Sequence, residues 1–241
     1  MTLSTDTILD ILQHGTTTIK GEFLWGSNYT FLVDVEHNGS ALQAVYKPTR
    51  GERPLWDFPA ATLARREVAA YLLSEALDWC LVPPTVYTRK GPVGPGSLQY
   101  FIEHDPEYHY FNFKDADRQR LRPVAFFDII INNADRKGSH ILIGSDNHIW
   151  LIDHGICFHV EDKLRTVIWD FAGERIPENM CGDLHHLLPK LREPSGLVSD
   201  LKRYLSSDEI NAVASRSERL LASNHFPNPH TSRRFQPWPP L

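Results

Sequence analysis

Two aspartates in the second half of the chain have the spacing and surroundings of a phosphoryl-transfer site. Asp135 lies in a polar loop between an apolar run and a β-like run, and Asp153 follows eighteen residues later, at the end of the apolar run 149–152. Two carboxylates at the ends of adjacent short elements can converge on one site. Phosphoryl transfer needs such a pair, because one Asp orients or deprotonates the attacking hydroxyl group and the other holds Mg²⁺ against the nucleotide phosphates.

A lysine in the first half strengthens this interpretation. Taken singly, each aspartate fits a turn or cap residue better, because Asp is common in loops. Lys47, however, follows the apolar β-like run 41–46, where a Lys can hold the α- and β-phosphates of a nucleotide and pair with a helix Glu. Glu67 is the candidate partner, and Glu75 is its rival about two turns further along the same predicted helix. Lys47 or Glu67 alone would be an ordinary solvated side chain, so the prediction rests on their combination with the aspartates.

Two weaker motifs accompany these residues. Gly26, Ser27 and Asn28 join the first two β-like runs, where backbone N–H groups could cradle phosphates. An ordinary hairpin turn fits these three residues about as well, since the full G-x-G-x-x-G pattern is absent. Several histidines, among them His140 and His154, raise the alternative of a zinc site, but the missing H-E-x-x-H spacing disfavours it.

Composition excludes several other classes of protein. The chain of 241 residues has a net charge of −5 and a pI near 6.2, which argues against non-specific nucleic-acid binding because that needs a basic footprint. Three scattered cysteines without C-x-x-C spacing are typical of reduced thiols. The N-terminus lacks the basic region of a secretion signal, and no run of about 18 apolar residues exists. We therefore expect a cytoplasmic protein without a transmembrane segment.

The elements that must position these residues are a small sheet in the first half and helices in the second. Alternating apolar residues and turn-forming breaks predict an antiparallel meander, followed by one helix and two more strands. We expect strands over residues 17–24, 29–35 and 41–46, a helix over 60–78, and strands over 85–88 and 98–102 that flank a Gly/Pro-rich loop over 90–96. In the second half we expect a helix over 117–132, short strands over 141–143 and 149–152, and helices near 184–191, 197–205 and 207–221. Pro123 either kinks the first of these helices or marks its first turn.

This order of elements predicts an α+β protein with two lobes around a shared cleft. A short helix near residues 8–12 opens the chain. The expected division is an N-terminal segment over 1–14, an N-lobe with a five-stranded sheet and a helix over 15–103, a C-lobe over 104–223, and a Pro-rich tail over 224–241. The composition of the tail favours an extended conformation.

The motif residues resemble the protein-kinase-like superfamily and, within it, the phosphatidylinositol 3/4-kinase-related branch. The matching segments are VYKP at residues 45–48, NADR at 133–136 and IDHGICF at 152–158. They are similar to type II phosphatidylinositol 4-kinases and, more loosely, to HipA-type kinases. RGERPLWDFP at 50–59 and NNADRKG at 132–138 resemble a small group of actinobacterial phosphatidylinositol 3/4-kinase-like proteins. The resemblance covers residues 15–191 and implies a protein-kinase-like two-lobed fold with a small antiparallel-sheet N-lobe and a mainly helical C-lobe.

The resemblance implies a role for each matching position. Lys47 would hold the phosphates of ATP, Asp135 would be the catalytic aspartate, and Asp153 would bind Mg²⁺ or Mn²⁺. The backbone that reads adenine would belong to the last N-lobe strand and the hinge, at Tyr100, Ile102 and Glu103.

One position departs from the family pattern. These kinases usually place a metal-binding Asn five residues after the catalytic Asp, and here that position is His140. Imidazole is a poor Mg²⁺ ligand and a better one for Mn²⁺ or Zn²⁺. The second metal is therefore absent, altered through His140, or held instead by Asn132 or Asn133.

Three functions remain open at this point. The first is an ATP-dependent kinase that transfers the γ-phosphoryl group to a hydroxyl of a protein, a small metabolite or, less readily, an inositol lipid. The second is a nucleotide-binding pseudokinase that acts as a scaffold or sensor, and the third is nucleotidyl transfer from a reoriented ATP. Retention of both Asp135 and Asp153 favours the kinase. Lys163 and Arg165, in the short segment after Asp153, either face an anionic substrate or lie on a solvated loop.

Overall fold

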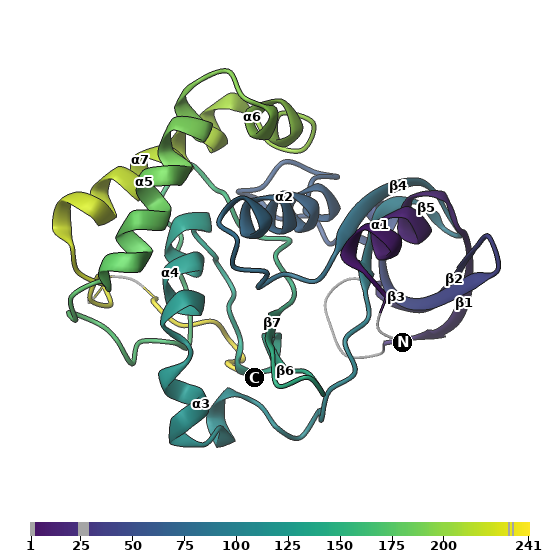
Figure 1. Ribbon diagram of the computed structural model, residues 1–241, viewed down its shortest axis with the longest axis horizontal. Coiled ribbons are helices and arrows are strands. Elements are labelled where there is room, and N and C mark those ends of the chain that lie inside the picture. Colours follow the sequence, from purple (N-terminus) through teal and green to yellow (C-terminus); the bar gives the residue numbers. More distant parts are fainter. Residues whose placement is uncertain (1–2, 24–28, 231, 233) are drawn as a thin grey trace.

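The chain folds into two lobes, one built on a sheet and the other built of helices (Figure 1). The computed structural model describes residues 3–23, 29–230, 232 and 234–241. A five-stranded antiparallel sheet curves next to a short helix at the right of Figure 1, and helices from the second half of the chain pack together at the left. This is the two-lobed α+β arrangement that the sequence predicts.

The sheet of the first lobe has the strand order β1-β2-β3-β5-β4, and every neighbouring pair is antiparallel. Its strands are β1 (Thr16–Glu22), β2 (Phe31–His37), β3 (Ser40–Pro48), β4 (Thr85–Gly91) and β5 (Gly94–Tyr100). The meander predicted for the first three strands is confirmed. Lys47 lies near the end of a central strand and is paired with Ser97 of β5.

The hairpin between β4 and β5 is tighter than the sequence suggests. The loop expected over residues 90–96 is a short turn, because β4 extends to Gly91 and β5 begins at Gly94. Gly96 pairs with Pro48 so closely that a Cβ on Gly96 would lie 2.3 Å from the carbonyl oxygen of Lys47. Glycine here is a requirement of close strand pairing rather than the sign of a loop.

An N-terminal helix packs directly on the sheet. Helix α1 (Thr5–His14) is longer than the helix expected near residues 8–12, and it begins after Ser4, whose hydroxyl accepts a hydrogen bond from the Thr7 N–H. The smaller of two hydrophobic cores lies between this helix and the sheet. It consists of Ile8, Ile11, Leu12, Val33, Val35, Leu42, Ala44, Tyr46, Val86 and Leu98.

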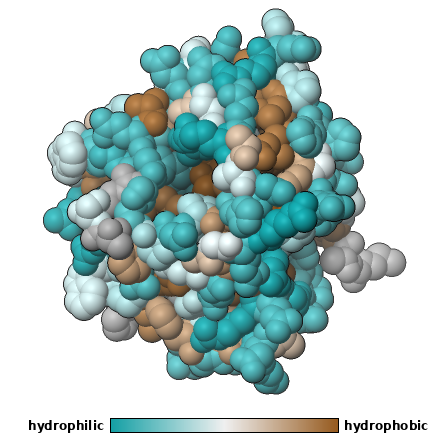
Figure 2. Space-filling model, turned by 90° about the vertical axis from the view of Figure 1, so that its left-hand side faces the viewer, coloured by the Kyte–Doolittle hydropathy of each residue, from teal (hydrophilic) through white to brown (hydrophobic). Residues whose placement is uncertain are grey.

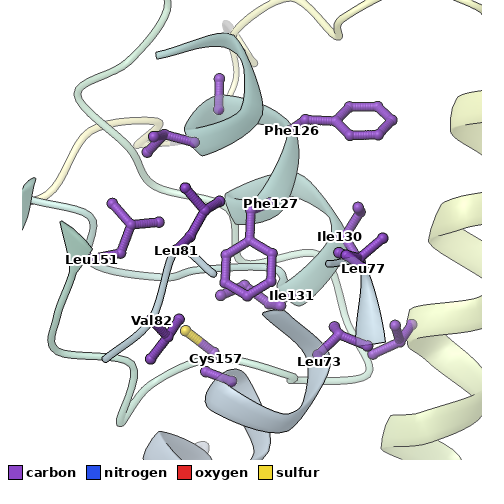
Figure 3. Close-up of a cluster of buried hydrophobic side chains, with 14 of the residues drawn as sticks. Leu73, Leu77, Leu81, Val82, Phe126, Phe127, Ile130, Ile131, Leu151 and Cys157 are labelled. Carbon is purple, nitrogen blue, oxygen red and sulfur yellow. The ribbon is translucent and has the colours of Figure 1, made fainter. Parts of the chain in front are cut away.

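Helix α2 (Leu63–Ala76) belongs to the larger hydrophobic core, which it shares with the second lobe. Figure 3 shows Leu73 and Leu77, at the end of α2, among the side chains of Phe127 and Ile130 from the second lobe. The helix that follows β3 is therefore anchored to the second lobe. The side chains of α2 are thus held in a fixed position relative to the second lobe. Lys47, in contrast, lies on β3 of the sheet.

The second lobe, within the described residues, contains five helices and a two-stranded sheet. These are α3 (Asp115–Gln119), α4 (Arg122–Ile131), α5 (Glu178–Arg192), α6 (Gly196–Leu201) and α7 (Ser207–Ser223), with β6 (Ile141–Ile143) antiparallel to β7 (Ile149–Leu151). Single 3-10 turns occur at Thr49–Gly51, Tyr110–Asn112 and Gly138–His140.

The single helix predicted over 117–132 is wrong, because α3 and α4 are separate. Pro123 lies in the first turn of α4, where an N–H has no partner within the helix to lose.

The segment after α7 has no regular secondary structure among its described residues. It is nevertheless attached to the second lobe, because the Phe226 side chain is buried and the backbones of Arg175 and His225 form an isolated bridge. Among the described helices, none is long and apolar enough to span a membrane.

Candidate active site

Lys47 lies between Glu67 and Asp153, which are two of the three carboxylates predicted to belong to a nucleotide site. Its Nζ donates to Glu67 Oε1 at 2.5 Å and to Asp153 Oδ1 at 3.1 Å. The Glu67 side chain is 3% exposed, whereas that of Asp153 is 50% exposed. Burial opposes the charge of Lys47, but Asp153 and Glu67 outweigh it and raise the pKa of Lys47 above its ordinary value. Lys47 is therefore a fixed cation beside a carboxylate that water can reach.

Glu67 also fixes the segment that follows Asp153. Its Oε2 accepts a hydrogen bond from the His154 N–H at 2.9 Å, while its Oε1 binds Lys47. The rival Glu75 lies near Asp78, and burial raises its pKa. The helix partner of Lys47 is thus Glu67.

Asp153 follows β7 and has a left-handed backbone, with a φ of 61°. Such a conformation is uncommon for a residue other than Gly and is enriched at functional sites. Its Oδ2 lies 3.3 Å from His140 Nε2. Burial raises the pKa of Asp153, but Lys47 and His140 outweigh this effect and hold it well below its usual range. Burial lowers the pKa of His140 to about 4, so its imidazole is neutral at pH 7.

Asp135 presents a carboxylate in the loop between α4 and β6. Its side chain is 30% exposed, and its Oδ2 lies 3.8 Å from Lys137 Nζ. Burial raises the pKa of Asp135 to about 6 against the opposing charge of Lys137, and the negative charge of Asp153 adds to the increase. A carboxylate with this pKa accepts a proton more readily than an ordinary Asp and is still mostly ionised at neutral pH.

A buried ion pair supports the loop that carries Asp135. The Nε of Arg136 lies 3.1 Å from each carboxylate oxygen of Asp128, and both side chains are fully buried. Arg136 Nη1 also donates to the carbonyl oxygen of Ile152 at 2.8 Å, and Nη2 lies 2.8 Å from His154 Nε2. The pair therefore ties this loop to the residues on both sides of Asp153.

The parts that Asp128 and Arg136 play beside the site are not predicted from the sequence, and His154 is predicted there only as a disfavoured zinc ligand. One signal could have indicated the first of these residues, since Asp128 interrupts the apolar run AFFDIII. A charged residue on a buried helix face needs a partner of opposite charge. Nothing in the local pattern shows that this partner is Arg136.

The two asparagines before Asp135 have structural roles. Asn132 ends α4 with a φ of 55°, and its Nδ2 donates to two carbonyl oxygens of the segment after Asp153, at 2.9 and 2.6 Å. The Nδ2 of Asn133 donates to Asp128 Oδ1 at 3.0 Å, and its Oδ1 accepts the Asp135 N–H at 2.9 Å. Both side chains are held by hydrogen bonds to the protein, and His140 is the side chain that lies beside Asp153.

The predicted adenine contacts lie at the end of β5 and just after it. The Tyr100 N–H donates to the carbonyl oxygen of Pro84 at 2.9 Å, and the carbonyl oxygen of Ile102 accepts from His104 Nδ1 at 2.8 Å. These two groups are engaged within the protein, and Glu103 follows them in the connection to the second lobe. The predicted phosphate-covering residues Gly26, Ser27 and Asn28 lie outside the described residues.

The segment after Asp153 is held by the loop that precedes α2. Lys163 Nζ lies 3.4 Å from Asp57 Oδ2, 3.2 Å from Glu161 Oε2 and 5.0 Å from the centre of the Trp56 ring. The Lys163 side chain is 13% exposed. Lys163 therefore stabilises contact between the lobes and does not face an open acceptor site.

The C-terminal residues cross the loop of Asp135. The Gly138 N–H donates to the carbonyl oxygen of Pro240 at 2.8 Å, and the Thr166 N–H donates to that of Phe235 at 3.1 Å. Figure 1 shows the C-terminus beside β6, close to this loop. The tail therefore borders the part of the molecule that presents Asp135.

Similarity to solved structures shows which fold the chain has. The chain resembles the Golgi casein kinase with Mn/ADP bound, with a TM-score of 0.53 and 16% identity over 90% of this chain and 74% of that chain. It also resembles the Helicobacter pylori proinflammatory kinase CtkA, with a TM-score of 0.52 and 10% identity over 89% of this chain and 94% of that chain. The fold is that of the protein-kinase-like proteins.

Sequence comparison then gives the family. Residues 60–222 match the model of the phosphatidylinositol 3- and 4-kinase family. The chain is 39% identical to Protein Rv2133c of Mycobacterium tuberculosis over 95% of this chain and 94% of that protein. It is 34% identical to phosphatidylinositol 4-kinase gamma 4 of Oryza sativa subsp. japonica, over 44% of this chain and 22% of that protein. The chain belongs to the phosphatidylinositol 3- and 4-kinase family, and family and fold together support a phosphotransferase.

Proposed function

We propose that this protein is an ATP-dependent kinase that transfers the γ-phosphoryl group to a hydroxyl acceptor. The observation that carries the proposal is the position of Lys47 between Glu67 and Asp153. This arrangement places a fixed cation for phosphates beside a carboxylate that can hold a metal ion. The acceptor would be a protein, a small metabolite or an inositol lipid, since a shared fold does not fix the substrate.

Asp153 and His140 would hold a divalent cation. The 3.3 Å between His140 Nε2 and Asp153 Oδ2 suits two neighbouring ligands of one ion. Imidazole suits Mn²⁺ better than Mg²⁺, so we propose that Mn²⁺ supports the reaction at least as well as Mg²⁺. The bound cation would neutralise charge on the transferred phosphoryl group.

The protein's own residues would divide the remaining work. Lys47 would bind the α- and β-phosphates, and Glu67 would keep its ammonium in place. Asp135 would orient the acceptor hydroxyl and take its proton at a carboxylate oxygen as the new bond to the γ-phosphorus forms. The bond from that phosphorus to the β,γ-bridging oxygen would break at the same time, and ADP would leave. The pKa of Asp135, raised to about 6 chiefly by burial, suits this role near neutral pH.

Labelled ATP tests the proposal. The protein is incubated with γ-labelled or α-labelled ATP and with Mg²⁺ or Mn²⁺, alone and with protein, metabolite and lipid acceptors. We expect transfer of the γ-label, or ATP turnover, that Asp135→Asn abolishes. The control Asp200→Asn should retain it, because Asp200 is exposed on α6. Transfer of the α-label would indicate nucleotidyl transfer instead, and failure to bind ATP would contradict the proposal.

His140 gives one reason to keep a second function, that of a nucleotide-binding pseudokinase. It stands at the position where related kinases have a metal-binding Asn, and its imidazole is neutral at pH 7 because burial lowers its pKa to about 4. A pseudokinase would bind ATP in a manner that depends on Lys47. Its turnover would be no greater than that of Asp135→Asn with either metal ion.

A further inference from the structure

A cavity of about 550 Å³ lies in the second lobe, away from Lys47 and Asp153. Its walls come from the segment after Asp153, from helix α7 and from the tail. Figure 2 shows this side of the molecule, where hydrophobic side chains are visible between hydrophilic ones. The apolar part of the wall includes Leu164, Leu220 and Phe226. The volume lies within the range of small-molecule sites, which is roughly 300–1,000 Å³.

Arg216 lines this cavity and lacks one partner that a buried guanidinium needs. The residue is 6% exposed. Its Nε donates to the carbonyl oxygen of Ile130 at 2.9 Å, and its Nη1 donates to that of His159 at 3.1 Å. Its Nη2 is buried and has no hydrogen-bond partner among the described residues. A buried charged donor without a partner is costly, so this nitrogen indicates a place for an anionic group.

The charged groups around Arg216 do not supply the missing partner of its Nη2. Burial lowers the pKa of Arg216 to about 10, Arg219 lowers it further and Asp162 opposes the change, so the guanidinium remains charged at neutral pH. Arg219 also lines the cavity, together with His225 and His230. Asp162 is the one carboxylate among the described lining residues, and its Oδ2 lies 3.3 Å from His230 Nε2. The wall is therefore cationic as well as apolar.

We propose that this cavity binds a small organic anion, with its carboxylate, sulfonate or phosphate group at Arg216 and its apolar body against Leu164, Leu220 and Phe226. An anion at Nη2 would complete the hydrogen bonds of the guanidinium through a charge-assisted bond, which is stronger than a bond between neutral groups. The apolar body would add the burial of hydrophobic surface. Binding does not depend on the proposed phosphoryl transfer.

The position of the cavity gives the anion a way to act on the active site. Asn132 lines the cavity and ends the helix that leads to Asp135, and its side chain holds the backbone of His159, Glu161 and Lys163. Phe235 also lines it, and the Phe235 carbonyl accepts the Thr166 N–H. An occupant therefore contacts a side chain and a tail that both hold the segment after Asp153. We expect the bound anion to make that segment more rigid. It would then act as an effector, because it would favour one arrangement of the segment beside Asp153.

A matched pair of fluorescent probes tests the binding site. Anilinonaphthalene sulfonate is an aromatic anion, and N-phenylnaphthylamine has nearly the same aromatic body without the charge. We expect the sulfonate to bind the native protein at one site, at least about tenfold more tightly than the uncharged probe, which is about 1.4 kcal/mol. Phenyl phosphate and phenylacetate, added as competitors, show whether a phosphate or a carboxylate is the preferred head group. Equal binding of the two fluorescent probes would overturn the proposal.

Variants locate the probe. Arg216→Gln keeps a donor but removes the charge, so it should weaken sulfonate binding about tenfold and change binding of the uncharged probe less than about twofold. Ser223→Trp should fill the cavity and abolish sulfonate binding, whereas Ser199→Trp, on the exposed surface of α6, should not. If Arg216→Gln does not fold, the serine pair still decides, because unchanged binding by folded Ser223→Trp contradicts the site.

Hydrogen exchange tests the link to the active site without any assay of transfer. With the sulfonate bound, the amides of Lys163 and Thr166 should exchange more slowly, and those of β1 should not change. This readout separates the inference from the proposed kinase activity, since a protein that never turns over ATP would still show the protection. Binding at Arg216 without protection of these amides would leave the site but overturn its role as an effector.

Discussion

Two charged networks contact the segment 152–154, and they differ in their access to water. In the first, Lys47 lies between Glu67 and the half-exposed carboxylate of Asp153. In the second, Arg136 and Asp128 are fully buried, and each guanidinium nitrogen of Arg136 has a protein partner. The first network can accept phosphates and a metal ion, whereas the second leaves no room for a ligand. Under the proposed function, the accessible network would bind substrate, and the buried network would hold the loop that carries Asp135.

The largest effect is expected when the buried network is broken. Arg136→Met leaves the Asp128 carboxylate buried without its charged partner, which typically costs about 3–5 kcal/mol. Denaturant unfolding followed by circular dichroism measures this loss. The matched control is Arg192→Met, which breaks an exposed pair with Glu218 and should cost less than about 1 kcal/mol. Similar losses in the two variants would contradict the structural role of Arg136.

Removing the cation of the accessible network should change chemistry more than folding. In Lys47→Met the phosphates lose a charged donor, and loss of one such preorganised donor typically lowers the rate about 10²–10³-fold. Labelled-ATP transfer measures the rate, and the same denaturant titration measures stability. The free energy of unfolding should fall by less than in Arg136→Met, because the Lys47 side chain is 22% exposed and water can replace its ammonium, whereas Arg136 is fully buried. A Lys47→Met protein that folds and transfers phosphate at the wild-type rate would show that this network is not the nucleotide site.

A smaller, metal-specific effect is expected at His140. His140→Asn replaces imidazole with an amide oxygen, which Mg²⁺ prefers, so the ratio of the Mg²⁺-supported to the Mn²⁺-supported rate should rise several-fold. The measurement is a titration of each metal ion at fixed ATP. An unchanged ratio would place His140 outside the metal site despite its 3.3 Å distance from Asp153.

The smallest expected effect is a shift along the pH axis. Because the base must be ionised, the transfer rate should rise with pH through about 6, the pKa of Asp135 that burial raises. The charge of Lys137 lowers this pKa, so Lys137→Met should move the rising limb to higher pH. The control is Lys202→Met, which changes an exposed lysine directly after α6. A limb that stays in place, or moves to lower pH, would argue against Asp135 as the base.

The sequence predicted the parts of the site that depend on local pattern. Strand alternation placed Lys47 at the end of β3, and the polar loop after an apolar helix identified Asp135. Helical periodicity located α2, although it could not choose between Glu67 and Glu75. Local patterns succeed here because each depends on the backbone geometry of a single element.

The parts that the sequence did not predict depend on contacts between distant elements. Periodicity predicts the helix α2, but not that it packs on the second lobe as well as on strands β4 and β5. The same limit applies to Asp128, whose buried partner lies eight residues away on another element. The break between α3 and α4 falls just before Pro123, which fits a kink within one long helix as well as the first turn of a new one, and only the structure decides for the first turn. The close pairing of strands that requires Gly96 cannot be inferred from composition.

The most direct test of the account is calorimetric titration of ADP with Mn²⁺ into the wild-type protein and into Asp153→Asn. Asp153 belongs to the accessible network, so the account predicts metal-dependent binding of the nucleotide to the wild type. Asp153→Asn should lose the dependence on Mn²⁺ while its unfolding midpoint stays closer to the wild-type value than that of Arg136→Met. Nucleotide binding that responds to Mn²⁺ equally in both proteins would contradict the account.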